Sequence, residues 1–226
     1  MTTIPDWQSG PVAVLASGGL DSAVLIGELS RTSPCVWPIY VRAGLHWEDA
    51  EQQALENYLE RLAAPAVQPL KVFHQPLGDV YGKHWSTSGE GVPDAESEDA
   101  AVFLPGRNLV LLSSPAVWCC LQKVPTIALG VLGGNPFPDA TDEYFRSFEQ
   151  TVGIALQTSL RVVRPYGRLK KVEVVRRGRD FPVGESLSCI QPMNGVHCGA
   201  CNKCEERRRA FQEAGVPDPT RYAHSS

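Results

Sequence analysis

The sequence predicts an α/β fold, a doubly wound parallel sheet followed by a small cysteine-rich C-terminal segment. Three observations carry this prediction. Short runs of branched apolar residues alternate with stretches of helical periodicity, as the strands and helices of a parallel sheet do. A glycine turn joins the first apolar run to the first helical stretch, and four cysteines lie close together near the C-terminus.

The expected elements follow one another in regular order. The first strand lies between Pro11 and Ser17, and a helix runs from the turn to Leu29. Further strands are expected at residues 36–41, 67–73, 126–129 and 160–163, and further helices at 48–63, 107–122, 142–157, 169–177 and 204–213. Ligands of a parallel sheet bind beyond the carboxyl ends of its strands, so the loops at residues 17–22, 42–47, 74–102 and 130–139 should meet there.

Composition excludes several classes of protein. The net charge of −4 argues against a dedicated nucleic-acid binder. No apolar run approaches the ~20 residues that cross a bilayer, and residues 1–11 lack the basic residues of a signal peptide. Seven cysteines, an odd number, are awkward in a secreted protein. A reducing, cytoplasmic location is therefore expected.

The first strand and its glycine turn form an anion site. Glycines let the backbone approach an oxygen cluster, and the N–H groups at the helix start point toward it. Ser17 and Ser22 add hydroxyl donors. The carboxylate of Asp21 would repel phosphates unless a cation lay between them, which predicts Mg²⁺ held jointly by Asp21 and a polyphosphate. The Walker A loop is excluded because no lysine follows the glycines.

Residues 17–22, Ser-Gly-Gly-Leu-Asp-Ser, resemble the pyrophosphatase loop of the PP-loop ATP pyrophosphatases, enzymes of the adenine nucleotide α hydrolase-like fold. The resemblance implies cleavage of ATP between its α and β phosphates. AMP would then be placed on a carboxylate or carbonyl oxygen, which activates the carbon for attack by nitrogen or sulfur. The residues expected to bind ATP with Mg²⁺ are Leu15, Ala16, Ser17, Gly18, Gly19, Leu20, Asp21 and Ser22.

The four C-terminal cysteines predict a structural zinc site. Cys189, Cys198, Cys201 and Cys204 have the spacing C-x8-C-x2-C-x2-C, and four thiolates complete a closed tetrahedral site. The neighbouring His197 is therefore not needed as a ligand. The chain is expected to divide into a PP-loop nucleotide-binding domain at residues 1–180 and a zinc-binding segment with a helix at residues 181–226.

Other basic and sulfur-containing residues have ordinary interpretations. The arginine run at residues 207–209 lends some weight to a nucleic-acid-binding zinc ribbon, but it is more typical of a solvated face or of partners for carboxylates. Cys35, Cys119 and Cys120 lie in apolar contexts and are expected to be small buried hydrophobes.

With the loop and the cysteine cluster both present, the chain resembles the 7-cyano-7-deazaguanine synthases of queuosine biosynthesis. The matching stretches run in order from residue 12 to about residue 219. Besides the loop and the cysteine cluster, they are Leu-Pro-Gly-Arg-Asn at residues 104–108, Pro-Asp at 138–139, Leu-Lys-Lys-Val-Glu-Val-Val at 169–175 and Phe-Gln-Glu-Ala-Gly-Val-Pro-Asp-Pro at 211–219.

The family resemblance implies a reaction and roles for four residues. Members use two ATP and ammonia to convert the carboxylate of 7-carboxy-7-deazaguanine into an amide and then a nitrile. Asp21 would help to hold Mg²⁺ and pyrophosphate, and Asp139 would contact substrate or metal. Arg107 and Lys171 would offset phosphate charge as it develops. The resemblance also implies a homodimer with the basic C-terminal helix or the zinc segment near its interface.

Three loops depart from the family pattern. Residues 40–47 lack the usual Tyr-Gly-Gln-Arg-His segment, residues 81–102 lack the Pro-Ser-Thr-Tyr run, and residues 133–137 lack a tyrosine-containing segment. These loops are expected to face the acceptor substrate. ATP-dependent activation of a carboxylate is therefore better supported than the identity of the carboxylate or the amine.

The sequence leaves alternative functions open. A diverged ligase would stop at the amide and join the carboxylate to another amine, including one on a protein. Sulfur transfer to tRNA would need a reactive cysteine outside the zinc site, for which Cys119 and Cys120 are the available pair. A degenerate nucleotide-binding or zinc scaffold is disfavoured because the loop keeps its glycines, its serines and Asp21. His46 and His84 are candidate general bases because both lie in the expected site loops.

Overall fold

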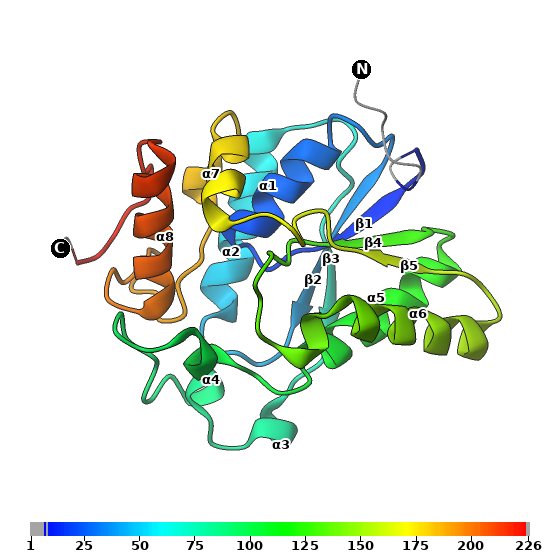
Figure 1. Cartoon of the computed structure of the whole chain (residues 1–226), viewed down its shortest axis with the longest axis horizontal. Coiled ribbons are helices and arrows are strands. Elements are labelled where there is room, and N and C mark those ends of the chain that lie inside the picture. The colour runs from blue at the N-terminus through cyan, green and yellow to red at the C-terminus, as the bar shows by residue number, and fades with distance from the viewer. Residues whose placement is uncertain (1–6, 8, 225–226) are drawn as a thin grey trace.

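A computed structural model describes residue 7 and residues 9–224 of the chain. At its centre is a five-stranded parallel sheet of order β3-β2-β1-β4-β5 (Figure 1). The strands are β1 (Val12–Leu15), β2 (Val36–Arg42), β3 (Lys71–His74), β4 (Thr126–Leu129) and β5 (Arg161–Val163). β2 and β4 flank β1 on opposite sides, so the strand order reverses at β1, where such sheets bind ligands. The predicted α/β class is confirmed.

Helices cover both faces of the sheet. One face carries α1 (Leu20–Leu29), α2 (Glu48–Leu62) and α7 (Lys171–Gly178), with α8 (Asn202–Ala214) packed outside α7. The other face carries α5 (Arg107–Leu121) and α6 (Asp142–Leu156), which lie apart from the first group in Figure 1. The short helices α3 (Gly78–Tyr81) and α4 (Trp85–Ser88) lie in the insertion after β3.

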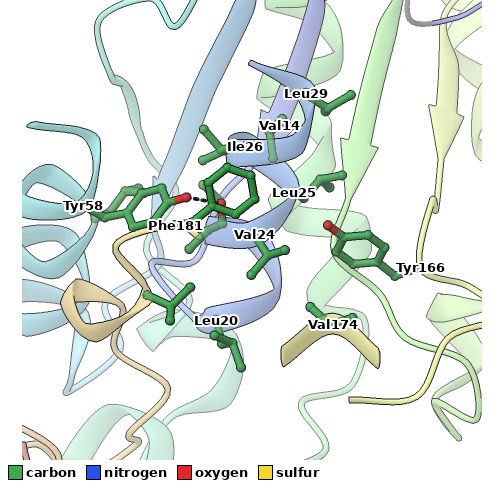
Figure 2. Packing of buried hydrophobic residues seen from close by; sticks show 14 of the residues in the cluster. Val14, Leu20, Val24, Leu25, Ile26, Leu29, Tyr58, Tyr166, Val174 and Phe181 are labelled. Carbon is green, nitrogen blue, oxygen red and sulfur yellow. Dashed lines mark hydrogen bonds between the residues drawn. The ribbon is translucent and has the colours of Figure 1, made fainter. Parts of the chain in front are cut away.

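The period-two alternation of β1 assigns its side chains to two separate cores. Val12 and Val14 pack with α1, whereas Ala13 packs with α5 and α6. In Figure 2 the ring of Phe181 lies over α1, and the hydroxyl of Tyr58 donates to the carbonyl oxygen of Ala23 at 2.6 Å. Gly27 of α1 makes room for the Phe181 ring, since a Cβ at residue 27 would lie 2.7 Å from that ring.

The third strand is shorter than predicted. The expected strand covers residues 67–73, but the ladder begins at Lys71, and Val67 makes only an isolated bridge with Val36. Pro69 interrupts the ladder because proline has no N–H to donate. The insertion at 74–102 is also less irregular than expected, since it contains α3, α4 and a 3₁₀ turn at Asp99–Val102.

A third apolar cluster joins the C-terminal segment to the loops beyond the sheet. It brings the four cysteines of the C-terminal segment together with Leu45, Trp47 and Leu104. Phe181 and Phe211 pack instead with α1, so the C-terminal segment contacts the α/β core as well. The division at residue 180 stays a prediction. In the described part of the chain no helix is long and apolar enough to cross a membrane; most of residues 1–11, on which the signal-peptide expectation rests, lie outside that part.

Candidate active site

The loop at residues 17–22 links β1 to α1 and is held by its own side chains. Ser22 Oγ accepts from the Ser17 N–H at 3.3 Å and donates to the Gly19 carbonyl at 3.0 Å. Gly18 adopts φ +71°, and a Cβ there would collide with the carbonyl oxygen of Glu51. Only glycine tolerates both the positive φ and the close approach of the Glu51 carbonyl, so residue 18 has to be glycine.

A cavity of about 440 Å³ opens beyond the carboxyl ends of β1 and β4. Seven of the eight predicted ATP-binding residues line it, all except Gly18, and so do Asp21, Arg107, Asp139 and Lys171. The loop after β4 reaches it closely, because a Cβ at Gly130 would lie 3.0 Å from the backbone of Asp21 and Ser22. Predicted site residues that are far apart in the sequence, from Leu15 to Lys171, therefore line the same cavity.

One side of the cavity, here named the charged wall, consists of Asp21, Lys171, Lys203 and Glu206. Lys171 Nζ lies 2.6 Å from Asp21 Oδ2 and 3.3 Å from Glu206 Oε1, and Lys203 Nζ lies 2.7 Å from Glu206 Oε2. Burial disfavours the charged form of Lys171, but Asp21 and Glu206 outweigh it and raise the Lys171 pKa. Burial likewise opposes ionisation of Glu206, yet the two lysines lower its pKa to about 2. Lys171 and Glu206 are therefore both charged at neutral pH.

Asp139 lies at the start of α5, whose first residue is Arg107. Asp139 Oδ2 accepts from the Asn108 backbone N–H at 2.9 Å, and the Asn108 side chain donates to the Asp139 carbonyl at 2.9 Å. A carboxylate at a helix N-terminus is favoured by the unpaired N–H groups there. Arg107 Nε and Asp21 Oδ1 are both buried without a hydrogen-bond partner among the described residues. Such orphaned groups suit ligand atoms: an anion for Arg107 and a metal for Asp21.

A second group of lining residues, here named the aromatic wall, consists of Tyr40, Trp47, Glu51 and Trp85. The rings of Trp47 and Trp85 stack with centroids 5.7 Å apart. The Tyr40 hydroxyl donates to Glu51 Oε2 at 2.8 Å, and only 8% of Glu51 is exposed. The prediction missed this wall. A signal was present, since Glu51 precedes Leu55 and Tyr58 at helical spacing and so lies on the apolar face of α2.

The two predicted candidate bases lie elsewhere. No histidine is among the described residues that line the cavity. The His84 Nδ1 lies 2.9 Å from the Ser86 hydroxyl at the start of α4, and the His46 ring lies against Gly89. Both side chains organise the insertion, so their assignment as general bases lacks a geometric basis.

The four cysteines of the C-terminal segment fit a tetrahedral metal site. Their sulfurs lie within 4.8 Å of one another, and the shortest separations are 3.5, 3.8 and 3.9 Å. A Zn–S bond of about 2.3 Å places tetrahedral sulfurs about 3.8 Å apart. Backbone N–H groups of Gln191, Cys198, Gly199 and Ala200 donate to these sulfurs, as thiolate ligands require. His197 stays outside the set and accepts from the Ser188 N–H at 3.1 Å.

The C-terminal segment also supplies residues to the cavity that the sequence did not reveal. Ser188 and Lys203, each adjacent to a cysteine, line it. Arg207 was expected on a solvated face or beside carboxylates; it is instead fully buried and donates to Ser186, Ser188 and the Val183 carbonyl. The Ser188 hydroxyl in turn lies 3.5 Å from the Leu20 N–H, so the cysteine-rich segment contacts the glycine turn.

A family model described as "Queuosine biosynthesis protein QueC" matches residues 11–215. The chain belongs to the QueC family. The 7-cyano-7-deazaguanine synthase of Syntrophobacter fumaroxidans is 30% identical over 92% of this chain and 94% of its own, and that of Xanthomonas euvesicatoria is 32% identical over 93% and 96%. A predicted tRNA methyltransferase subunit from Methanocaldococcus jannaschii matches in structure with a TM-score of 0.52, 14% identity, and coverage of 92% of this chain and 89% of its own; it supports the fold alone.

Each loop in which this QueC chain departs from the family pattern contributes to the cavity. Trp47 and Trp85 come from the first two, and Phe103, just beyond the second, stacks on Phe137 of the third at 4.8 Å. A second, larger cavity of about 910 Å³, lined by Arg61, Arg179 and residues 215–217 among others, contains none of the predicted catalytic, ATP-binding or zinc residues.

The remaining cysteines do not form a reactive pair. Cys119 is fully buried, as expected, whereas Cys35 and Cys120 are half-buried. Burial raises the pKa of Cys119 to about 12, and burial also raises that of Cys120. Neither thiol is a thiolate at neutral pH, and neither lines the cavity, which removes the basis for sulfur transfer through them.

Proposed function

We propose that this protein is a 7-cyano-7-deazaguanine synthase. It would activate the carboxylate of 7-carboxy-7-deazaguanine with AMP from ATP, couple it to ammonia, and convert the amide to the nitrile with a second ATP. The observation that carries the proposal is the meeting of the glycine turn with Arg107, Asp139 and Lys171 around one cavity in a chain of the QueC family.

The charged wall suits the first chemical step. Asp21, with its unpartnered Oδ1, would hold Mg²⁺ beside pyrophosphate, and the metal would supply charge neutralisation for the leaving group. Lys171 lies between two carboxylates and would shift toward phosphate oxygens once they enter. Arg107, whose Nε lacks a partner, would donate to the α-phosphate from the other side. Asp139 would orient the substrate through its place at the start of α5.

We further infer zinc as the resident metal of the cysteine cluster. Four buried sulfurs at tetrahedral spacing support it, and the metal would fix Ser188 and Lys203 against the cavity without joining the chemistry. Residues 181–226 would thus act as a zinc-stabilised appendage to residues 1–180. A reducing cytoplasm, which keeps these thiols free, and a homodimer stay part of the proposal.

A diverged amide ligase is the second candidate. It is favoured by the aromatic side chains, among them Trp47, Phe103 and Phe137, that the departing loops place around the cavity. Such an enzyme would stop after one activation and use another amine, including one on a protein.

One assay separates these functions. The protein is incubated with Mg²⁺, ATP, 7-carboxy-7-deazaguanine and ammonium, and pyrophosphate release and product mass are followed. The nitrile synthase releases two pyrophosphates for each nitrile formed, whereas the ligase releases one and leaves an amide. Asp21→Ala should abolish both products. No carboxylate-dependent pyrophosphate from the wild type would overturn the proposed function.

A further inference from the structure

Four carboxyl groups line the cavity, and three of them are committed to partners. Asp21 and Glu206 are paired with lysines in the charged wall. Asp139 accepts the N–H of Asn108 at the start of α5. Glu51 differs from Asp21 and Glu206 because it makes no ion pair among the described residues, and from Asp139 because its hydrogen-bond donors are side chains rather than the N–H of a helix start.

Glu51 is the member of the aromatic wall that lies against the glycine turn. Its stem touches the turn, since a Cβ at Gly18 would lie 3.2 Å from Glu51 Cγ. Its carboxyl group accepts from the Tyr40 hydroxyl at 2.8 Å and from Trp47. The group therefore reaches the space next to the phosphate site, where an activated carboxylate must lie to receive AMP.

The charges around Glu51 leave it close to half-ionised at neutral pH. Burial raises the pKa of Glu51 to about 7. Arg107 from α5, Tyr40 from β2 and Trp47 each lower it, and Glu48 on the same helix raises it slightly. A carboxyl group with this balance can accept a proton and release it again within one turnover, which Glu206, with its much lower pKa, does poorly.

We propose that Glu51 is the catalytic base that accepts protons from the substrate nitrogen during amide and nitrile formation. This inference rests on the proposed function. In the first step the nitrogen lone pair of ammonia forms the C–N bond, the C–O bond to AMP breaks with its electron pair staying on the phosphate oxygen, and one N–H proton passes to Glu51.

The second step uses the same base. The amide oxygen attacks the α-phosphate of a second ATP, pyrophosphate leaves, and one nitrogen proton passes to Glu51 to give an O-adenylated imidate. The remaining N–H proton then passes to Glu51, its electron pair forms the third C–N bond, and the C–O bond breaks to release AMP and the nitrile. Glu51 returns each proton to solvent.

The test compares wild type, Glu51→Gln, Tyr40→Phe and the matched control Glu60→Gln, an exposed glutamate on the same helix. Amide and nitrile formation are measured from pH 5.5 to 9 at constant free ammonia, so that titration of ammonium does not enter the profile. Pyrophosphate release in the first turnover without ammonium is measured separately and reports adenylation.

In wild type and Glu60→Gln, product formation should rise tenfold per pH unit below an apparent pKa near 7. Glu51→Gln should lose this limb and about 10²–10⁴-fold in product formation while keeping first-turnover pyrophosphate release. Tyr40→Phe should move the limb to higher pH, because the hydroxyl stabilises the carboxylate. Infrared difference spectra of wild type against Glu51→Gln should show a carboxyl group titrating in the same range without any substrate.

Two kinetic results, and one spectroscopic result, would overturn the inference while leaving the proposed function intact. One is an unchanged pH limb in Glu51→Gln; the other is an equal loss of adenylation and product formation, which indicates a structural role. An infrared spectrum without a carboxyl group titrating near neutrality would also overturn it. Failure of wild type to release pyrophosphate would instead refute the proposed function and the inference together.

Discussion

The charged wall and the aromatic wall handle buried carboxyl groups in opposite ways. In the charged wall, Glu206 faces two lysines and stays an anion down to low pH. In the aromatic wall, Glu51 faces neutral donors and a more distant arginine, and its pKa rises to about 7. The comparison teaches that one cavity can hold a balanced set of charges beside a carboxyl group without an ion pair, which suits the proposed division between phosphate binding and proton transfer.

Removing the zinc ligands should produce the largest effect, because the charged wall depends on them. Cys201→Ser, or chelation, should lower the free energy of unfolding by at least about 4 kcal/mol and Tm by roughly 10 °C. Lys203 and Glu206 would lose their positions, whereas Tyr40 and Glu51 would keep theirs. Thermal unfolding measures the change, with Cys35→Ser, outside the cluster, as the control. Equal melting temperatures would contradict a structural metal.

Lys171→Met should break the charged wall alone. Removing one fixed cation from the phosphate site should lower carboxylate-dependent pyrophosphate release about 10²–10³-fold, because the charge developing on the phosphates loses a partner. Adenylation and product formation should fall together, unlike in Glu51→Gln. Lys170→Met, the exposed neighbour, should stay close to wild type. A loss confined to product formation would reverse the roles assigned to the two walls.

The carboxyl groups of the two walls should change the free energy of unfolding in opposite directions as pH rises. The folded pKa of Glu51 exceeds its ordinary value of 4.5, so its favourable contribution is complete below pH 4.5 and is lost as pH rises through 7. Glu51→Gln should therefore be more stable than wild type at pH 8.5 by about 3 kcal/mol, and the difference should shrink toward pH 4.5.

Glu206 supplies the contrast, because its pKa is lowered. Its contribution is present above pH 4.5 and is lost as pH falls toward 2. Glu206→Gln should destabilise the protein at neutral pH. Urea unfolding at several pH values measures both variants against Glu60→Gln. If the change in free energy of unfolding varied with pH in the same direction in both variants, the comparison would be refuted.

The smallest expected effect concerns how the C-terminal segment is seated. In Gly27→Ala the new methyl group would press on the Phe181 ring at 2.7 Å, and overpacking should exceed the gain in helix propensity by about 1–2 kcal/mol. Gly78→Ala is the matched control, since a Cβ there meets nothing within 4 Å. Urea unfolding measures both, and a stabilised Gly27→Ala would show that the ring moves aside without cost.

Much of the site could be predicted because its parts are local. The glycine turn follows β1 and starts α1 within eleven residues, and the last three cysteines lie within seven. Patterns of this length fix a backbone conformation directly, so the loop and the zinc segment could be described from the sequence. The start of the third strand was predicted wrongly only because the missing N–H of Pro69 was not taken into account.

The electrostatic partners could not be predicted, because they are far apart in the chain. Lys171 and Asp21 are 150 residues apart, and the pairing depends on how α7 packs against α1. The burial of Arg207 among hydroxyl groups likewise depends on the path of residues 183–188, which has no periodic pattern.

The sequence alone determined the fold class, the family, the phosphate loop and the four-cysteine cluster, since each rests on short-range pattern and residue type. Only the tertiary structure decided that His46 and His84 lie outside the cavity, that the cysteine-rich segment contributes Ser188 and Lys203 to it, and that Glu51 lines it without an ion pair among the described residues. The reason is physical: the pKa of a side chain depends on burial and on charges brought close by packing, and its neighbours in the sequence determine neither.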